Sequence, residues 1–464
     1  MRAHEAGALH ADLGRRAPAW LRPPTDVNAL LPPLWPATAG RGGDGVLTAG
    51  GVPVTELAAA HGTPAYVLDE ADLRTRCREF VAGFPGVDVF YAGKAFLCKA
   101  VVRIIAEEGL GLDVCTGGEL ATALAAGMPP DRIGFHGNNK STAELARALD
   151  AGVGRIIVDS SAEIDRLTGL ARQRGVRPRV LVRVTVGVEA HTHEYIATAH
   201  EDQKFGFSLA GGTGGSAFDA AARILADGVL ELAGLHSHIG SQIFDSSGFE
   251  VSARRVLGLQ ARLRDTLRVE PPELDLGGGF GIAYTTQDDP APPAELGKQL
   301  LTIVEDECRA LRLAVPRLAV EPGRAIVGPA MFTLYRVGTV KDVDGIRSYV
   351  SVDGGMSDNI RTALYDAAYS ATLASRASSA GPMLARVVGK HCEAGDIVVA
   401  DEFLPADLRP GDLLAVPGTG AYCRSMASNY NHVPRPPVVA VAGGRSRVIV
   451  RRETEADLLA LDVG

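Results

Sequence analysis

Residues 86–94, Gly-Val-Asp-Val-Phe-Tyr-Ala-Gly-Lys, join a short apolar run to a lysine that follows it directly. A run of this length, rich in Val, Phe and Tyr, is typical of a buried strand. Further runs of the same kind follow along the chain, separated by amphipathic helical patterns such as Thr142–Ala151 and Phe249–Arg268. Alternating units of this kind predict a closed (β/α)8 barrel of parallel strands. The expected strands are 87–91, 111–114, 132–135, 155–158, 179–184, 232–236, 273–276 and 317–320.

After Pro329 the sequence changes to Val-rich, alternating segments broken by Gly, Pro and Asp. This pattern is typical of a separate all-β domain. We therefore expect an α/β protein with a barrel at 66–329 and a β domain at 330–464. Residues 1–44 form a Pro- and Gly-rich arm to which we assign no chemistry, and residues 45–65 are expected to join the β domain. The expected β-domain strands are 332–340, 349–352, 385–388, 397–400, 413–416, 438–441 and 448–451.

The composition excludes several classes of partner. The chain has 464 residues, of which 46% are apolar, and a net charge of −8 without a basic run. Nucleic acid and membrane lipid are therefore not expected partners. No stretch is typical of a signal peptide or a membrane span, which favours a cytoplasmic location. The six cysteines include no close CxxC pair, so we expect free, mostly buried thiols.

Active sites of such barrels lie at the carboxyl ends of the strands, and unusual residues follow nearly every expected strand. Lys94 follows the first strand and could be a nucleophilic amine, although alone it would be read as a surface lysine. Gly277, Gly278 and Gly279 follow the seventh strand, where barrels commonly bind phosphate, and the five-residue glycine-rich pattern at this strand favours phosphate binding over a plain turn.

Glu321 and Arg324 follow the eighth strand. A buried carboxylate can pair with a protonated ring nitrogen and a guanidinium can bind an anion, although a structural ion pair is equally compatible. An amine, a phosphate site, a histidine that could stack on a ring and a carboxylate together meet the needs of one cofactor, pyridoxal phosphate.

With these residues in place, the chain resembles the group IV pyridoxal-phosphate-dependent decarboxylases of alanine-racemase-like fold, and within them the diaminopimelate decarboxylase family. The resemblance extends from about Val46 to the C-terminus, and the segment Gly389–Asp396 discriminates best within the group. The matching segments are 91–96, 113–120, 136–141, 187–194, 204–207, the loops after strands six, seven and eight, 357–365, 389–396 and 420–422.

The resemblance implies a role for each matching residue. It makes Lys94 the covalent attachment point of the cofactor, His238 the residue stacked on its ring and Glu321 the partner of its ring nitrogen. It makes Cys392 a proton donor. The residues implied to bind the phosphate are Ser241, Gly278, Gly279, Glu321, Pro322, Gly323 and Arg324, and those implied to bind substrate are Arg324, Arg361, Tyr365, Glu393 and Tyr422, which also contacts the cofactor.

The implied reaction is the conversion of meso-diaminopimelate to L-lysine and CO2, with the site shared between the subunits of a homodimer. A related decarboxylase of ornithine, arginine or carboxynorspermidine is the alternative enzyme. The pairs His191/His193 and His236/His238 could instead belong to a metal-dependent barrel hydrolase, but such enzymes usually carry the pair on the first strand, so no metal is expected. A non-catalytic barrel that carries pyridoxal phosphate is a further alternative, which the long β domain disfavours.

Overall fold

A computed structural model of the chain describes residues 17–187, 203–210 and 215–464. It divides into two compact units, each built from separate parts of the chain. The barrel unit comprises Arg74–Gly281 and Pro290–Ile326, and the β unit comprises Met1–Leu73, Ile282–Asp289 and Val327–Gly464.

The barrel unit contains the closed ring of parallel strands that the sequence predicts. Each ring strand pairs in parallel with the next one in sequence, including β8 with β9, and the pairing of β13 with β5 closes the ring. A short strand, β10 (Phe207–Ser208), pairs with β9 outside the ring. The ring strands are β5 (Asp88–Ala92), β6 (Gly111–Val114), β7 (Ile133–Phe135), β8 (Arg155–Val158), β9 (Arg179–Thr185), β11 (Glu231–Ser237), β12 (Glu273–Asp275) and β13 (Arg317–Val320).

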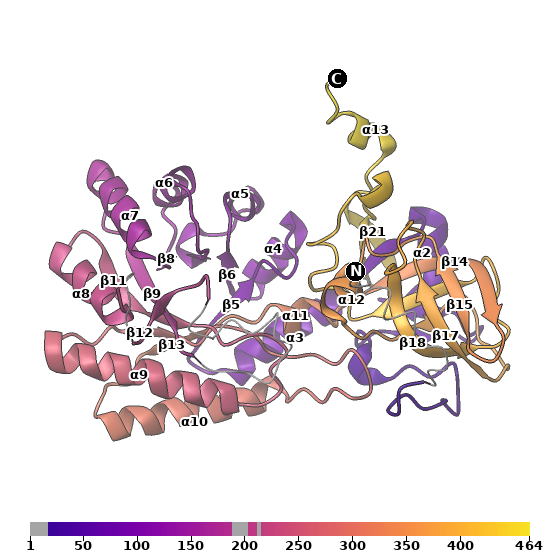
Figure 1. Cartoon of the computed structure of the whole chain (residues 1–464), viewed down its shortest axis with the longest axis horizontal. Coiled ribbons are helices and arrows are strands. Elements are labelled where there is room, and N and C mark those ends of the chain that lie inside the picture. Colours follow the sequence, from indigo (N-terminus) through magenta and orange to yellow (C-terminus); the bar gives the residue numbers. More distant parts are fainter. Residues whose placement is uncertain (1–16, 188–202, 211–214) are drawn as a thin grey trace, which may run out of the picture. The chain divides into compact units, whose positions relative to one another are not determined.

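Helices surround this ring of strands (Figure 1). Local sequence fixes their ends: α6 begins at a capping box formed by Ser141 and Glu144 and ends at Gly152, whose φ is 74°. The helices predicted at 142–151 and 249–268 are confirmed as α6 and α9 within one or two residues. The barrel helices are α4 (Lys99–Glu107), α5 (Gly117–Ala126), α6 (Thr142–Ala151), α7 (Ser161–Arg174), α8 (Ala217–Asp227), α9 (Ser247–Leu267) and α10 (Pro293–Leu311).

The β unit is organised around one large sheet with the order β18-β17-β15-β14-β4-β20-β21. The strand β19 also pairs with β14, and β16 pairs with β19. Every strand predicted after Pro329 is present. The strands are β14 (Met331–Val343), β15 (Arg347–Val352), β16 (Thr372–Leu373), β17 (Pro382–Val388), β18 (Ile397–Pro405), β19 (Leu413–Pro417), β20 (Val438–Ala442) and β21 (Arg445–Val450).

One strand of this sheet precedes the barrel in sequence. The strand β4 (Ala65–Asp69) pairs with β14 and β20, although we expected the barrel to begin at residue 66. Its residues are all buried, because sheet partners on both sides enclose it. The compact barrel unit therefore starts later, inside the helix α3 (Glu70–Gly83).

The N-terminal segment also belongs to the β unit. Its strands β1 (Gly40–Arg41), β2 (Leu47–Ala49) and β3 (Val52–Pro53) form a small sheet of their own, followed by α2 (Val54–His61). Trp35 is 5% exposed and its ring lies 5.9 Å from that of Phe332. The described part of the arm is therefore partly built into the core.

The remaining elements are short, and no described helix is long and apolar enough to cross a membrane. The six cysteines are free, and four of them are buried. The short elements are the 3-10 turns η1 (Pro32–Leu34), η2 (Pro130–Arg132) and η3 (Tyr430–His432) and the helices α11 (Arg324–Val327), α12 (Arg361–Tyr365) and α13 (Glu455–Leu459).

Candidate active site

Lys94 lies in the turn that follows β5, at the carboxyl end of the barrel, and its side chain is exposed. Burial, and next the charge of Lys94, hold the pKa of His238 well below its usual value. Lys94 also acts electrostatically on Cys115 and Glu119, which follow β6. The ammonium group of Lys94 thus faces the mouth formed by β5, β6 and β11.

His238 follows β11, and its ring is held by the glycine loop. The backbone N–H of Gly278 donates to Nδ1 of His238 over 3.2 Å. Nδ1 is therefore the acceptor nitrogen, which agrees with a neutral ring. In this arrangement the Gly278 N–H, which we expected to bind phosphate, fixes the orientation of the predicted stacking residue.

The loop after β12 requires its glycines because neighbouring backbone lies against it. A Cβ atom at Gly278 would lie 2.2 Å from the carbonyl oxygen of Glu321, and one at Gly279 would lie 2.4 Å from that of Gly240. Gly279 also has a φ of 107°, in the region that favours glycine. The loops after β11, β12 and β13 are thus in direct contact.

Side chains join the same loops. A guanidinium nitrogen of Arg324 donates to Oγ of Ser241 over 2.9 Å, which connects the loop after β13 with the loop after β11. The N–H of Ile243 donates to the carbonyl oxygen of Gly279 over 2.9 Å. These contacts form a compact cradle of glycine backbone, hydroxyl and guanidinium, a donor set that suits a phosphate group.

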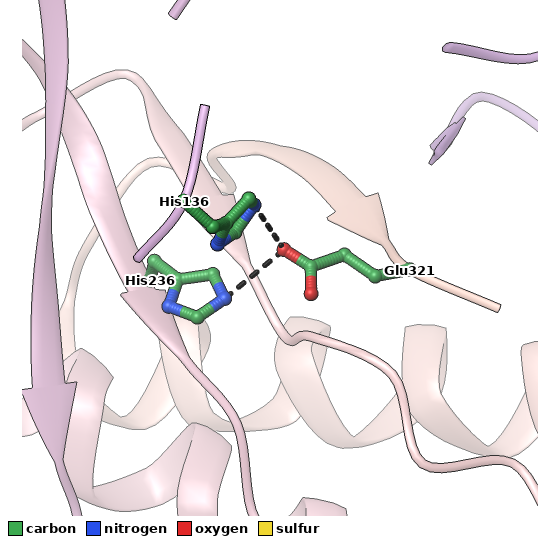
Figure 2. A group of neighbouring side chains, drawn as sticks. All are labelled: His136, His236 and Glu321. Atoms are coloured by element: carbon green, nitrogen blue, oxygen red, sulfur yellow. Dashed lines mark ion pairs between the residues drawn. The ribbon is translucent and has the colours of Figure 1, made fainter. Parts of the chain in front are cut away.

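Glu321 lies beside this cradle, at the centre of a buried cluster. Its Oε1 is 3.1 Å from Nε2 of His136 and 3.0 Å from Nε2 of His236. Figure 2 shows both contacts ending on the same oxygen, while the other carboxylate oxygen takes part in neither. Asp113 adds a second carboxylate, whose Oδ1 lies 3.3 Å from Nε2 of His136.

The side chains of this cluster differ in their pKa values and therefore in their charge. Burial lowers the pKa of His136, but the charges of Glu321 and Asp113 outweigh it and raise the value to about 9. Burial dominates at His236 and lowers its pKa to about 4. Burial opposes ionisation of Glu321, but His136 and His236 hold its pKa well below the usual value. Near neutral pH His136 is therefore an imidazolium, His236 a neutral imidazole and Glu321 a carboxylate.

The sequence patterns indicate no role for His136 or His236 within a cofactor site, although His136 follows the strand predicted at 132–135 and His236 ends the one predicted at 232–236. Their common contact with Glu321 depends on which side chains of β7, β11 and β13 point inward, and the strand pattern alone does not specify this. Deeper in the barrel, a guanidinium nitrogen of Arg155 lies 3.1 Å from Oδ2 of Asp275, another buried pair that we did not predict.

Apart from Arg324, which belongs to the barrel unit, the predicted substrate residues lie in the β unit. Arg361, at the start of α12, is 3% exposed and donates to the hydroxyl of Tyr369 over 2.6 Å. Its guanidinium carbon is 4.9 Å from the ring centroid of Tyr284. Tyr365 ends the same helix and is half-buried. The two aromatic partners of Arg361 were not predicted.

Cys392 and Glu393 are both exposed on the loop between β17 and β18. Oδ1 of Asn431 accepts from the backbone N–H of Cys392 over 3.2 Å and lies 3.2 Å from Nδ1 of His391. Asp396 accepts from the N–H of His391 over 2.7 Å, which anchors the other side of the loop. Tyr422, which has a φ of 67°, is half-buried.

The metal-dependent alternative concerns two histidine pairs. His191 and His193 lie outside the described residues, as does most of the segment 187–194. In the second pair, His236 contacts Glu321, and the ligand atoms of His136, His236 and Glu321 lie within 4.8 Å of one another. His238 has a different partner, Gly278. The adjoining phosphate-type cradle and Lys94 fit pyridoxal phosphate better than a metal-activated water.

Comparison with known proteins decides between these interpretations. Residues 70–328 match the family of the pyridoxal-dependent decarboxylases, pyridoxal binding domain. Diaminopimelate decarboxylase of Mycobacterium tuberculosis (strain H37Rv) is 58% identical over 446 residues, which cover 94% of this chain and 98% of that protein. The chain belongs to the diaminopimelate decarboxylase family.

Further relatives cover most or all of the chain. The diaminopimelate decarboxylase of Mycobacterium leprae is 55% identical over 477 residues and covers 100% of both chains. The crystal structure of diaminopimelate decarboxylase from M. jannaschii in co-complex with L-lysine has a TM-score of 0.86 and 30% identity, and covers 93% of this chain and 99% of that one. As a member of this family, the chain is a pyridoxal-phosphate-dependent carboxy-lyase.

Proposed function

We propose that this diaminopimelate decarboxylase converts meso-diaminopimelate to L-lysine and CO2, the last step of lysine biosynthesis, with Lys94 as the covalent attachment point of its cofactor. The observation that carries the proposal is the barrel mouth, where Lys94, His238, Glu321 and the glycine cradle occupy adjacent strand ends. Family membership supplies the substrate.

Bound pyridoxal phosphate supplies an electron sink for the electron pair that remains when a carboxylate leaves as CO2. In this chain Glu321 would bind the ring nitrogen, and the neutral ring of His238 would pack on one face of the cofactor. Ser241, Gly279, Arg324 and the backbone of Glu321–Arg324, which includes Pro322 and Gly323, would hold the phosphate. Gly278 would contribute by fixing His238.

The overall reaction breaks one carbon–carbon bond and forms one carbon–hydrogen bond at the same carbon. A proton must therefore be delivered to that carbon after CO2 leaves. Cys392 is the proposed donor, because its exposed thiol stands on a loop whose backbone is fixed by Asn431 and Asp396.

The substrate has two amino-acid ends of opposite configuration. If the product is L-lysine, the carboxylate must be lost from the D centre, so the L end must be recognised and retained. Arg361 would bind a carboxylate and Glu393 an ammonium group, with Tyr365 and Tyr422 as further contacts. The buried, aromatic-framed guanidinium of Arg361 suits this role because it is preorganised.

We further propose that a two-fold homodimer shares each site between subunits and that the enzyme acts in the cytoplasm. Cell fractionation checks the location.

A substrate panel tests the proposed reaction. The holoenzyme is incubated with meso-diaminopimelate, ornithine, arginine or carboxynorspermidine, and both CO2 and the amine product are quantified. We expect equal amounts of CO2 and L-lysine from meso-diaminopimelate, and at least a hundredfold lower kcat/KM with the other substrates. Faster turnover of ornithine, arginine or carboxynorspermidine would establish the alternative enzyme instead.

A further inference from the structure

We propose that His136 is a positioning residue for the cofactor-binding carboxylate. Together with His236 it holds Oε1 of Glu321 and leaves Oε2 for the ring nitrogen of pyridoxal phosphate. The inference rests on the proposed pairing of Glu321 with that nitrogen. It gives a role to a buried side chain that is not itself expected to touch the cofactor or the substrate.

The geometry places His136 between two carboxylates. Its Nε2 lies 3.1 Å from Oε1 of Glu321 and 3.3 Å from Oδ1 of Asp113. The side chains of His136, Asp113 and Glu321 are 7%, 4% and 8% exposed, so water screens these contacts only weakly. The three residues come from the ends of β7, β6 and β13.

Two imidazoles on one oxygen restrict how the carboxylate can turn. The last torsion of a glutamate side chain is broad, so an isolated carboxylate samples many orientations. Here His136 and His236 approach Oε1 from two strands, and their rings are nearly perpendicular, at 69°, with centroids 5.0 Å apart (Figure 2). Turning the carboxylate would separate Oε1 from both nitrogens at once.

The charge of His136 is the main source of this restraint. Nε2 of His136 and Oε1 of Glu321 are close enough for an ion pair, but neither atom makes a hydrogen bond of good geometry. The interaction is therefore largely Coulombic. Burial is outweighed by Glu321 and Asp113 in setting the pKa of His136 at about 9, so the imidazolium persists at neutral pH.

The charge of His136 also affects the ionisation of Glu321. A buried carboxylate without a cation tends to take up a proton, and a protonated Glu321 would be a weak acceptor for a protonated ring nitrogen. His136 keeps the carboxylate ionised before the cofactor arrives. His236, whose pKa burial lowers to about 4, adds no second positive charge, but its Nε2 lies 3.0 Å from Oε1 and limits the space into which that oxygen can move.

The test compares cofactor binding by four proteins: wild type, His136→Gln, Glu321→Gln and the double variant. Each apoprotein is titrated with pyridoxal phosphate, and the dissociation constant and absorbance maximum of the bound cofactor are measured. We expect His136→Gln to raise the dissociation constant at least tenfold and to move the absorbance maximum in the same direction as Glu321→Gln. Because His136 acts through Glu321, the double variant should bind no more weakly than Glu321→Gln.

Lys140→Met is the matched control for disturbance of the same loop. The Lys140 ammonium lies 2.8 Å from Oε1 of Glu163 and donates to the carbonyl oxygens of Gly137 and Ile157, at 2.6 and 2.8 Å. It has no described contact with Glu321. This variant should lower the melting temperature while leaving the absorbance maximum unchanged and the dissociation constant within about twofold.

The possible outcomes distinguish a failure of this inference from a failure of the proposed function. If Glu321→Gln alters binding and spectrum but His136→Gln does not, the role of His136 is wrong and the pairing of Glu321 stands. If Glu321→Gln alters neither, the pairing itself fails. If the dissociation constant of the double variant rises by the product of the two single effects, His136 acts independently of Glu321. Stoichiometric zinc in the wild type that is lost in His136→Gln would make the cluster a metal site and overturn the inference.

Discussion

At the scale of single residues, Arg361 is a buried charge of the β unit that we propose binds a substrate carboxylate. Its guanidinium is buried, donates to Tyr369 and lies over the ring of Tyr284. No carboxylate within ion-pair distance is described for it, so its charge is stabilised by aromatic faces and a hydroxyl. A substrate carboxylate would complete its set of partners.

Replacing Arg361 tests this role. Arg361→Ala should raise KM for meso-diaminopimelate because a charge-assisted contact is lost, with a cost of about 2 to 3 kcal/mol in kcat/KM. Tyr369→Phe is the matched variant: it keeps the ring but removes the hydroxyl partner, and should raise KM less. Steady-state kinetics on the holoenzymes give both values. An unchanged KM in Arg361→Ala, together with a lower melting temperature, would assign Arg361 a purely structural role.

Some residues of this candidate site could be predicted from the sequence and others could not. Lys94, His238, Glu321 and Arg324 could be identified because each follows a recognisable strand at the barrel mouth. Their neighbours His136 and Asp113 could not be assigned roles, because those depend on which side chains meet across strands far apart in sequence. The buried network around Glu321 is visible only when the ring of strands is closed.

At the scale of elements, the loop after β12 determines how closely the carboxyl ends of three strands approach one another. Its glycines lie against the backbone of the loops after β11 and β13. A triple glycine was interpreted from sequence as a phosphate-binding loop. The structure adds a second requirement, close backbone packing, which would select glycine even without a ligand.

Gly279→Ala should therefore weaken cofactor binding at least tenfold, because its Cβ would lie 2.4 Å from the carbonyl oxygen of Gly240 and the loop would have to move. Gly258→Ala is the control. Gly258 lies within α9, and a Cβ there would meet nothing within 4 Å. Titration of both apoproteins with pyridoxal phosphate measures the effect. Equal dissociation constants for the two variants would contradict the importance of this packing.

Strand patterns predicted the barrel and the large sheet well because buried strands carry uninterrupted apolar runs. They missed β4, because no strand was predicted at 65–69 and the barrel was expected to begin at residue 66. Only the pairing of residues 65–69 with β14 and β20 places them in the β unit. The pairing of strands distant in sequence is a tertiary choice that local patterns do not specify.

At the scale of the whole molecule, the proposed site requires residues from both compact units. Lys94 and Glu321 belong to the barrel unit, whereas Cys392, Glu393 and Arg361 belong to the β unit. The proposed homodimer supplies one set from each subunit. Such an arrangement leaves an isolated subunit without a complete site.

Mixing two inactive variants tests this sharing. Lys94→Ala and Cys392→Ala proteins are combined under conditions that permit subunit exchange, which mass spectrometry verifies. Mixed dimers should regain activity, because one of their two sites then contains both intact residues. Activity that stays at the level of the separate variants after confirmed exchange would show that Cys392 does not act on the partner's Lys94.

The central claim, that this barrel binds pyridoxal phosphate covalently at Lys94, is tested most directly by reducing the holoenzyme with borohydride and mapping the labelled peptide by mass spectrometry. Reduction makes the bond between the cofactor and its lysine permanent. We predict one label per chain, on Lys94, and none on the other lysines of the barrel. A label on a different lysine, or none on a protein that decarboxylates meso-diaminopimelate, would contradict the claim.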